Sequence, residues 1–261
     1  MTAPPRYAIF GDESTLPRMA QMLGASVAAV VTASARPQSA GVSACIAAAT
    51  PALQQPPRSA HRYQTFLRDL EALRPDFLLC FSYSMLLGPE VLALPRHGAI
   101  NIHGGLLPAY RGANVVNWVL IEGASETGVT AHYMTARIDA GDIVMQEKVA
   151  IDRDDTALTL KTKLDDTGFR ILERLHRAIC AKEALPRRPQ DESKARHYKR
   201  RKPEDGRIDW RCSNEQIYNL VRALVAPWPG AFFYDRLGQK VVLDRRLTLQ
   251  EIQKLREDHA Q

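Results

Sequence analysis

Two polar residues at the end of a short apolar run have the clearest potential for chemistry in this sequence. Asn101 and His103 close the run Gly98-Ala-Ile-Asn-Ile-His, whose composition predicts a buried strand. Residues i and i+2 of a strand point to the same side, so we expect the amide and the imidazole to lie side by side. Both groups can donate hydrogen bonds, and together they could stabilise an oxyanion during acyl transfer.

A second group of polar residues lies further along the chain. The turn-like stretch Ile138-Asp-Ala-Gly-Asp142 carries two carboxylates beside a glycine. A carboxylate close to His103 would stabilise the charged imidazolium and could act as a general base. Each piece alone also fits a structural role, because a histidine at a strand end is often packed in place and an Asp-x-Gly-Asp loop is often a plain turn.

The combination of these pieces resembles a known family. The 10-formyltetrahydrofolate-dependent formyltransferases carry the signature N-x-H-x-S-L-L-P-x-x-R-G, which is similar to Asn101-Ile-His-Gly-Gly-Leu-Leu-Pro-Ala-Tyr-Arg-Gly112. The resemblance continues in Glu126-Thr-Gly-Val-Thr130 and in Ile138-Asp-Ala-Gly-Asp-Ile143. Two departures, Gly105 where serine is usual and Val115 where many members have proline, flank the site. Because of these departures, the sequence defines the transfer reaction better than it defines the acceptor.

The resemblance implies catalytic roles for Asn101, His103 and Asp139. Asn101 and a protonated His103 would stabilise the oxyanion that forms when an amine attacks the formyl group of 10-formyltetrahydrofolate. Asp139 would favour the charged form of His103 and take the proton of the amine, directly or through water. This chemistry requires no metal.

The resemblance also implies where the two substrates bind. The folate cosubstrate is expected between the run that follows the third strand and the Asp139 loop, where backbone groups would read the pterin. The expected donor-binding residues are Phe81, Ser82, Tyr83, Ser84, Met85, Leu86, Ile138, Ala140, Gly141 and Asp142. Among these, Tyr83 and Met85 fit core packing equally well. The expected acceptor-binding residues are Tyr110, Arg111, Gly112 and Asn114.

Strand-like and helix-like segments alternate through the first 185 residues. The predicted strands are 7–10, 27–32, 76–81, 98–103, 128–134 and 143–151, and the predicted helices are 16–23, 61–73 and 156–181. This alternation predicts the α/β class, with a Rossmann-like, doubly wound, mostly parallel sheet. Residues 35–58, rich in Ala, Ser and Pro, are interpreted as a surface segment with no assigned element.

The character of the chain changes after Pro186. Residues 194–202 contain six Lys or Arg in nine positions, which could form a solvated linker or a groove for phosphates. We therefore predict a catalytic domain over 1–186, a basic linker over 187–207 and a small C-terminal α+β subdomain over 208–261. This last part is predicted to contain helices at 214–225 and 249–256 and a strand at 240–244.

An apolar stripe runs along the first predicted helix of the C-terminal part. Its members are Ile217, Leu220, Val221 and Leu224. The stripe could be buried within the chain or could pack against a second copy in a homodimer, and burial within the chain is the favoured alternative.

Three functions are considered for this sequence. The favoured one is an N-formyltransferase that acts on the primary amine of a nucleotide-linked amino sugar, because Asn117–His132 and Asp139-Ala-Gly look most similar to sugar formyltransferases of lipopolysaccharide biosynthesis. The second is a methionyl-tRNA formyltransferase-like enzyme that acts on aminoacyl-tRNA or another small amine. It is disfavoured because only about 30 residues follow Ala231, too few for a five-stranded tRNA-binding barrel. The third, a non-catalytic folate- or nucleotide-binding module, conflicts with the three filled catalytic positions.

Composition limits the compartment and the partners. The net charge is +6, which raises the question of nucleic acid, but the excess is concentrated in the basic linker. No run of about 18 apolar residues predicts a membrane span, and the first residues do not resemble a signal peptide. The cysteines at 45, 80, 180 and 212 form no C-x-x-C pair, so zinc and dithiol sites are disfavoured. A reducing cytoplasm is the expected location.

Overall fold

The computed structural model describes residues 3–33 and 50–259, so the part of the predicted surface segment at 35–49 lies outside the described residues. The chain divides into two compact units. The first comprises Met1–His103, Val129–Glu147 and Thr167–Ser193, and the second comprises Gly104–Gly128, Lys148–Asp166 and Lys194–Gln261.

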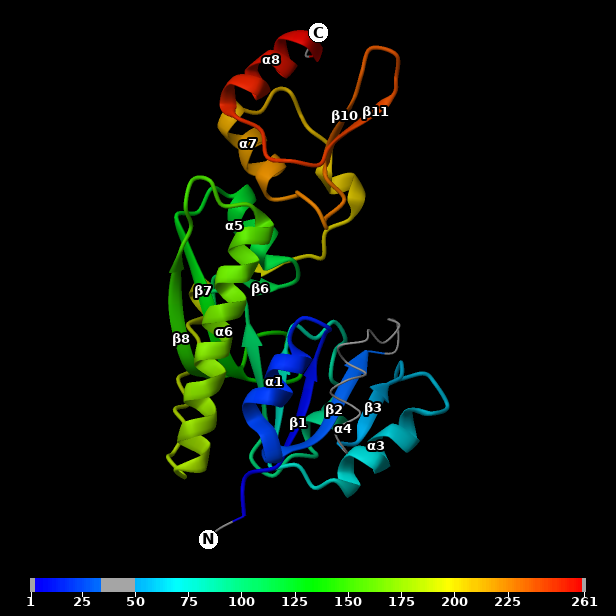
Figure 1. Cartoon of the computed structure of the whole chain (residues 1–261), viewed down its shortest axis with the longest axis vertical. Coiled ribbons are helices and arrows are strands. Elements are labelled where there is room, and N and C mark those ends of the chain that lie inside the picture. Colours follow the sequence, from blue (N-terminus) through cyan, green and yellow to red (C-terminus); the bar gives the residue numbers. More distant parts are fainter. Residues whose placement is uncertain (1–2, 34–49, 260–261) are drawn as a thin grey trace. The chain divides into compact units, whose positions relative to one another are not determined.

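A seven-stranded sheet forms the centre of the fold, with the strand order β3-β2-β1-β4-β5-β7-β8 (Figure 1). The strands are β1 (Tyr7–Gly11), β2 (Val27–Ala33), β3 (Ala52–Gln55), β4 (Phe77–Phe81), β5 (Ala99–His103), β7 (Glu126–Tyr133) and β8 (Ile143–Ala150). The pairs from β3 to β5 are parallel, whereas β5 and β7 are antiparallel. The chain order reverses at β1, with β2 and β3 on one side and β4 and β5 on the other. The predicted Rossmann-like, doubly wound, mostly parallel sheet is therefore confirmed.

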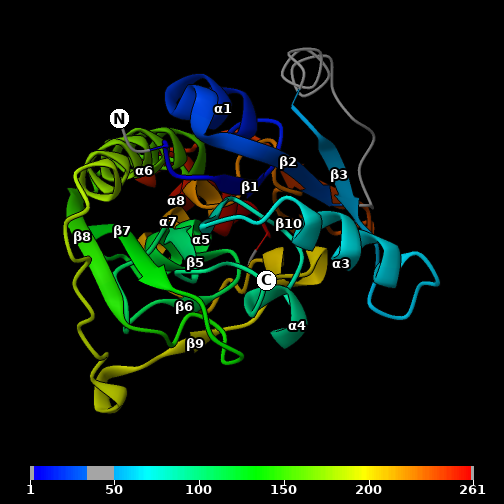
Figure 2. The same cartoon turned by 90° about the horizontal axis from the view of Figure 1, so that it is seen from below.

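Helices cover both faces of this sheet (Figure 2). One face carries α1 (Leu16–Leu23) and the C-terminal part of α6 (Ala157–Cys180), and the other carries α3 (Tyr63–Ala72) and the short α4 (Pro89–Leu92). Phe81 packs on Phe169 of α6 with 5.1 Å between ring centroids. On the other face, Phe66 and Leu70 of α3 belong to one cluster with Phe10 and Cys80. Burial on both faces explains why the central strands are almost continuously apolar.

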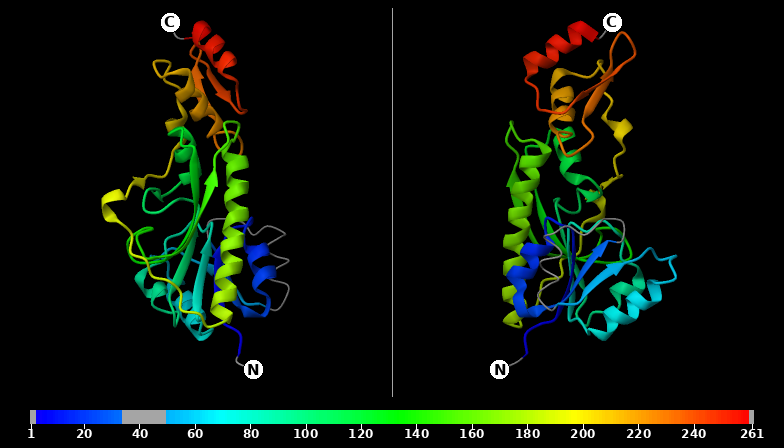
Figure 3. Two further views of the ribbon diagram at one scale, coloured as in Figure 1. Left: turned by 90° about the vertical axis from the view of Figure 1, so that its left-hand side faces the viewer. Right: turned by 45° about the vertical axis from the view of Figure 1, so that its right-hand side comes forward.

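The second unit contains short elements around two small sheets. In it, β6 (Arg111–Gly112) pairs in parallel with β9 (His197–Tyr198), and β10 (Ala231–Tyr234) pairs with β11 (Lys240–Leu243) as an antiparallel hairpin. Its helices include α5 (Val115–Ile121), α7 (Asn214–Arg222) and α8 (Leu249–His259). Three short 3-10 helices are described in the chain. They are η1 (Gly24–Ser26), η2 (Glu192–Lys194) and η3 (Pro203–Gly206). Figure 3 shows α7, α8 and the hairpin at the C-terminal end of the chain. The predicted small C-terminal α+β region is thus present.

The helix α7 begins at Asn214, the residue at which the sequence predicts its start. Ser213 caps it, because its Oγ accepts a hydrogen bond from the Gln216 N–H while the Gln216 side chain accepts one from the Ser213 N–H. Ile217 and Val221 are at most 2% exposed, and α7 packs against α5 and α8 of the same unit. Ile217, Val221 and Leu224 of the apolar stripe are therefore buried, as the favoured alternative predicts, whereas Leu220 keeps partial exposure.

Among the described residues, no helix has the length and apolar character needed to cross a membrane.

Candidate active site

The pairing of β5 with β7 places four polar side chains on one face of the sheet. Asn101 is opposite His132, and His103 is opposite Thr130. Because side chains alternate along each strand, these four residues point the same way. His103 is only 8% exposed, so a group bound beside it would be largely shielded from water.

The loop that follows β7 brings the carboxylate of Asp139 between the two imidazoles. Oδ2 lies 3.7 Å from Nδ1 of His103, and Oδ1 lies 3.5 Å from Nε2 of His132. The separation from His103 permits an ion pair with a protonated ring, and contacts of this length are common between catalytic groups before substrate binds. Asp139 has a φ of 50°, a left-handed conformation that Asp and Asn adopt more readily than most residues. The structure thus brings together the three residues to which the sequence assigned catalysis.

His132 is a residue of this candidate site that sequence reasoning missed. It is 1% exposed, and its Nδ1 lies 2.9 Å from the carbonyl oxygen of Tyr133. A carbonyl only accepts, so Nδ1 must carry a hydrogen, and in the neutral ring Nε2 is then an acceptor. Nε2 lies 3.3 Å from Nδ2 of Asn101, which can donate to it. His132 therefore fixes the orientation of the Asn101 amide. The signal in the sequence was the alternation of polar Thr130 and His132 with apolar Val129 and Ala131.

Replacing His132 with leucine is expected to lower kcat about tenfold, because the Asn101 amide loses the acceptor that orients it. Steady-state kinetics on the His132→Leu variant would measure this loss. His97→Leu removes an exposed imidazole that packs on Phe77 and serves as the matched control. If His132→Leu retains the kcat of this control and only lowers the unfolding free energy, His132 has a packing role and does not orient Asn101.

Some of the expected donor-binding residues lie at the end of β4 and in the loop that follows it. These residues include both buried and exposed side chains. Phe81 is 3% exposed, and Tyr83 packs edge-on against Phe10 while its hydroxyl donates to Oε1 of Gln55 at 2.9 Å. Burial raises the pKa of Tyr83 above its ordinary value, so its hydroxyl stays protonated. Ser84 is exposed, Met85 is partly exposed and Leu86 is 70% exposed. The buried side chains shape the loop and the exposed ones are accessible to a ligand.

A glutamine on β3 fixes this same loop. Gln55 is 1% exposed, accepts the hydrogen bond from Tyr83 and donates through Nε2 to the carbonyl of Leu86 at 3.1 Å. Ser82 at the start of the loop has a φ of 55°, so the chain turns sharply directly after β4. Sequence reasoning missed Gln55 because the four residues of β3 lack the β-branched composition typical of a strand.

The Asp139 loop presents a similar mixture. Ile138 is 49% exposed, whereas Gly141 is buried. A Cβ on Gly141 would lie 1.9 Å from the carbonyl oxygen of Tyr133, so only glycine fits there. The carbonyl of Asp142 accepts the Tyr133 N–H at 2.9 Å, which closes the base of the loop.

The residues expected to bind the acceptor lie in the second unit and contact the basic linker. Tyr110 stacks on Tyr198 with 5.3 Å between centroids, and Gly112 leaves no room for a Cβ against the Tyr198 carbonyl. Oδ1 of Asn114 accepts the Arg201 N–H at 3.0 Å. Arg111 is fully buried, so its guanidinium is not accessible to a ligand in this structure. Tyr110 and Asn114 retain partial exposure.

The basic linker is partly neutralised by acidic residues of the same unit. Glu122 accepts hydrogen bonds from Arg196 at 2.7 Å and from the Tyr198 hydroxyl at 2.8 Å. Lys199 lies 3.7 Å from Asp205. These contacts favour a docked linker over an open phosphate groove.

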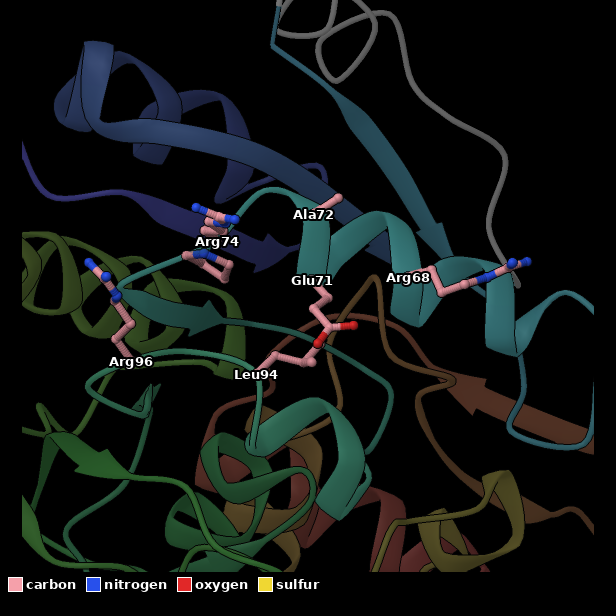
Figure 4. A pocket seen from close by; sticks show the side chains of 7 residues that line it. Arg68, Glu71, Ala72, Arg74, Leu94 and Arg96 are labelled. Carbon is pink, nitrogen blue, oxygen red and sulfur yellow. The ribbon is translucent and has the colours of Figure 1, made fainter.

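A cavity of the first unit lies away from the candidate active site. It measures about 590 Å³ and is lined by Arg68, Arg74 and Arg96 together with Glu71 and Leu94 (Figure 4). Its lining comes from α3 and from the turns that precede β4 and β5, the amino ends of those strands. His103 closes the opposite end of β5, so this cavity is separate from the candidate active site.

Comparisons with known protein families identify the family of this chain. Residues 14–175 match the model of the formyl transferase family, and residues 200–259 match the formyl transferase C-terminal domain. The chain belongs to the formyl transferase family. It is a folate-dependent formyltransferase, and the donor used by this family is formyltetrahydrofolate. Among the described residues, no group of three or more His, Cys, Asp or Glu is placed to hold a metal ion.

Solved structures with the same fold come from several branches of this family. A sugar N-formyltransferase from a Shewanella species has a TM-score of 0.75 and 18% identity, with 94% of this chain and 98% of that chain covered. Phosphoribosylglycinamide formyltransferase from Bacillus halodurans has a TM-score of 0.59 and 27% identity, with 68% and 97% covered. HypX from Aquifex aeolicus in complex with tetrahydrofolic acid has a TM-score of 0.64 and 18% identity, with 92% and 37% covered.

Proposed function

We propose that this formyltransferase moves the formyl group of 10-formyltetrahydrofolate to the primary amine of a nucleotide-linked amino sugar. One observation carries the choice of acceptor. The sugar N-formyltransferase matches 94% of this chain, whereas the phosphoribosylglycinamide enzyme matches 68%. The similarity to the sugar enzyme therefore extends over far more of the chain, and this favours a sugar acceptor over glycinamide ribonucleotide.

The packing of the C-terminal region supports the same choice over aminoacyl-tRNA. Arg256 of α8 donates to the carbonyl oxygens of Trp210 and Cys212 and, through Nε, to Oδ1 of Asn214 at 2.8 Å. The ring of Phe233 on β10 packs on Trp210 with 5.2 Å between centroids. Helix and hairpin thus close a small core around Phe233, and the strands described in this C-terminal region are β10 and β11, fewer than the five that a barrel needs.

The geometry of the catalytic residues suits the addition of an amine to a formyl carbon. His103 turns Nδ1 toward Asp139, so the shape of the ring directs Nε2 away from the carboxylate and toward a substrate oxygen. One N–H of the Asn101 amide faces His132, and the second is available to the same oxyanion. Asp139 stabilises the imidazolium and is the base for the proton that the attacking amine loses.

Two loops of the first unit fit the folate. The exposed side chains of Leu86 and Ile138 are apolar, and exposed apolar groups suit the flat faces of an aromatic ring system. The main-chain groups of the same loops can pair with the polar edge of the pterin. The donor supplies the electrophilic formyl carbon, and the loops orient it.

An acceptor screen tests the proposal. The enzyme would be incubated with 10-formyltetrahydrofolate and with nucleotide-linked amino sugars, charged initiator tRNA or glycinamide ribonucleotide, and tetrahydrofolate release would be followed. The highest kcat/KM is expected for a nucleotide-linked amino sugar. A higher kcat/KM for initiator tRNA or for glycinamide ribonucleotide would overturn the sugar assignment and leave the family assignment intact.

A further inference from the structure

The segment that follows α6 runs along the loop that carries Asp139. Arg188 forms an antiparallel bridge with Ile143, in which the Ile143 N–H donates to the Arg188 carbonyl at 2.8 Å and the Arg188 N–H donates back at 3.1 Å. The guanidinium of Arg187 lies 3.6 Å above the ring centroid of Tyr133. We call residues 187–192 the strap. Because Tyr133 and Ile143 flank the loop at 134–142, the strap contacts the residues at both of its ends.

Gln190 connects the strap to the middle of the loop. Its Nε2 donates to the carbonyl of Asp139 at 2.8 Å and to the carbonyl of Gly141 at 2.7 Å. A side-chain amide nitrogen carries two hydrogens, so both are directed at main-chain oxygens of this loop. Gly141 is buried and Asp139 is partly buried, so water has limited access to replace these bonds.

These two bonds restrain the backbone from which the carboxylate of Asp139 projects. The Asp139 carbonyl belongs to the peptide group that follows the residue, so holding it restrains the ψ angle of Asp139 and with it the direction of the Cα–Cβ bond. The φ of 50° is a conformation that the backbone does not favour without support. The carboxylate lies 3.7 Å from His103 and 3.5 Å from His132, so a displacement of about 1 Å would separate it from one of them.

We propose that Gln190 is a positioning residue for formyl transfer, which holds Asp139 in register with His103 and His132 by binding the main chain on both sides of Ala140. The strap is the first part of the basic linker, so this contact connects the linker to the loop at 134–142. This inference rests on the catalytic role proposed for Asp139, and it does not depend on the identity of the acceptor.

The first test uses Gln190→Met, which keeps the length of the side chain and removes both donors. With the best acceptor, kcat is expected to fall about tenfold to a hundredfold. Glu192→Gln is the matched control, because it removes the exposed Glu192–Arg137 ion pair between the same strap and the same loop, and it should leave kcat within about twofold of the wild type.

A double variant separates positioning from a general loss of stability. If Gln190 acts through Asp139, adding Gln190→Met to Asp139→Asn should change kcat by less than about twofold. Losses that multiply in the double variant, or a Gln190→Met enzyme as fast as the Glu192→Gln control, would overturn the inference.

Hydrogen exchange gives a readout that needs no acceptor. Gln190→Met should accelerate amide exchange in residues 134–142 and leave the strands β1 and β4 unchanged. Unchanged exchange in the loop, or faster exchange throughout the sheet, would count against the inference. A wild-type enzyme that formylates no nucleotide sugar would overturn the proposed function, whereas the exchange result would still decide the role of Gln190.

Discussion

An enzyme in which His103 is replaced by alanine is expected to lose formyl transfer by about a hundredfold to a thousandfold in kcat. In the proposed mechanism the imidazole is the cationic donor toward the oxyanion, and the Asn101 amide alone cannot supply a positive charge. The fold should survive, because His103 lies at the end of β5 and is not a member of the apolar cluster that contains Phe66 and Leu70 of α3. The measurement is kcat with saturating donor and acceptor, together with the circular dichroism spectrum and the midpoint of thermal unfolding.

His61→Ala provides the control for the loss of a histidine. His61 is exposed in the turn before α3, and its removal should leave kcat unchanged. Turnover by the His103 variant within threefold of this control would show that the oxyanion is stabilised by other groups. A variant that has lost both activity and its unfolding transition would be replaced by His103→Gln, which keeps a neutral donor and should recover part of the lost rate.

The candidate catalytic pair on β5 was accessible to sequence reasoning because it depends on local chemistry. Alternation along a strand already determines that Asn101 and His103 share a face, whatever the rest of the fold does. The central strands were equally accessible, since burial on both faces leaves long apolar runs such as Phe77–Phe81. The carboxylates of the loop at 138–142 were candidates from their residues alone, but the choice of Asp139 came from the family signature, because nothing local shows that its loop folds back over β5.

The supporting residues were less accessible for a physical reason. Gln55, His132 and Gln190 act through hydrogen bonds to residues 28 or more positions away, and single polar residues of this kind carry no periodic pattern. Arg111 shows the opposite limit of sequence reasoning, because burial cannot be read from the residue type. Arginine is usually a surface residue, so a ligand contact was a natural interpretation, yet its side chain is fully buried.

The short strands show a related limit of sequence patterns. The strands β6 and β9 have two residues each, which is too short for any alternation to be recognised. The strand β10 follows the Pro-rich run 226–230, where a turn is the natural interpretation. These strands form because their partners are brought to them by the surrounding fold.

Replacing Asp139 with asparagine is expected to reduce kcat by about a thousandfold. The substitution removes a base for the amine proton and the negative charge that faces His103, so both catalytic functions of the carboxylate are lost together. Asparagine adopts the left-handed backbone conformation as readily as aspartate, so the loop should keep its shape, and the side-chain volume is unchanged. Asp69→Asn, which neutralises an exposed carboxylate on α3, controls for the change in net charge.

The two substitutions Asp139→Asn and His103→Ala can be combined in one enzyme. If Asp139 works largely by stabilising the charged form of His103, the two residues act as a unit, and the His103→Ala, Asp139→Asn double variant should be scarcely slower than the slower single variant. If instead Asp139 works as a base that is independent of His103, the two losses should multiply, and the double variant should fall to the uncatalysed rate. Steady-state kinetics on the four enzymes decides between these outcomes. An Asp139→Asn enzyme within tenfold of the wild type would contradict both, and would move the proton acceptor to a different group of the site.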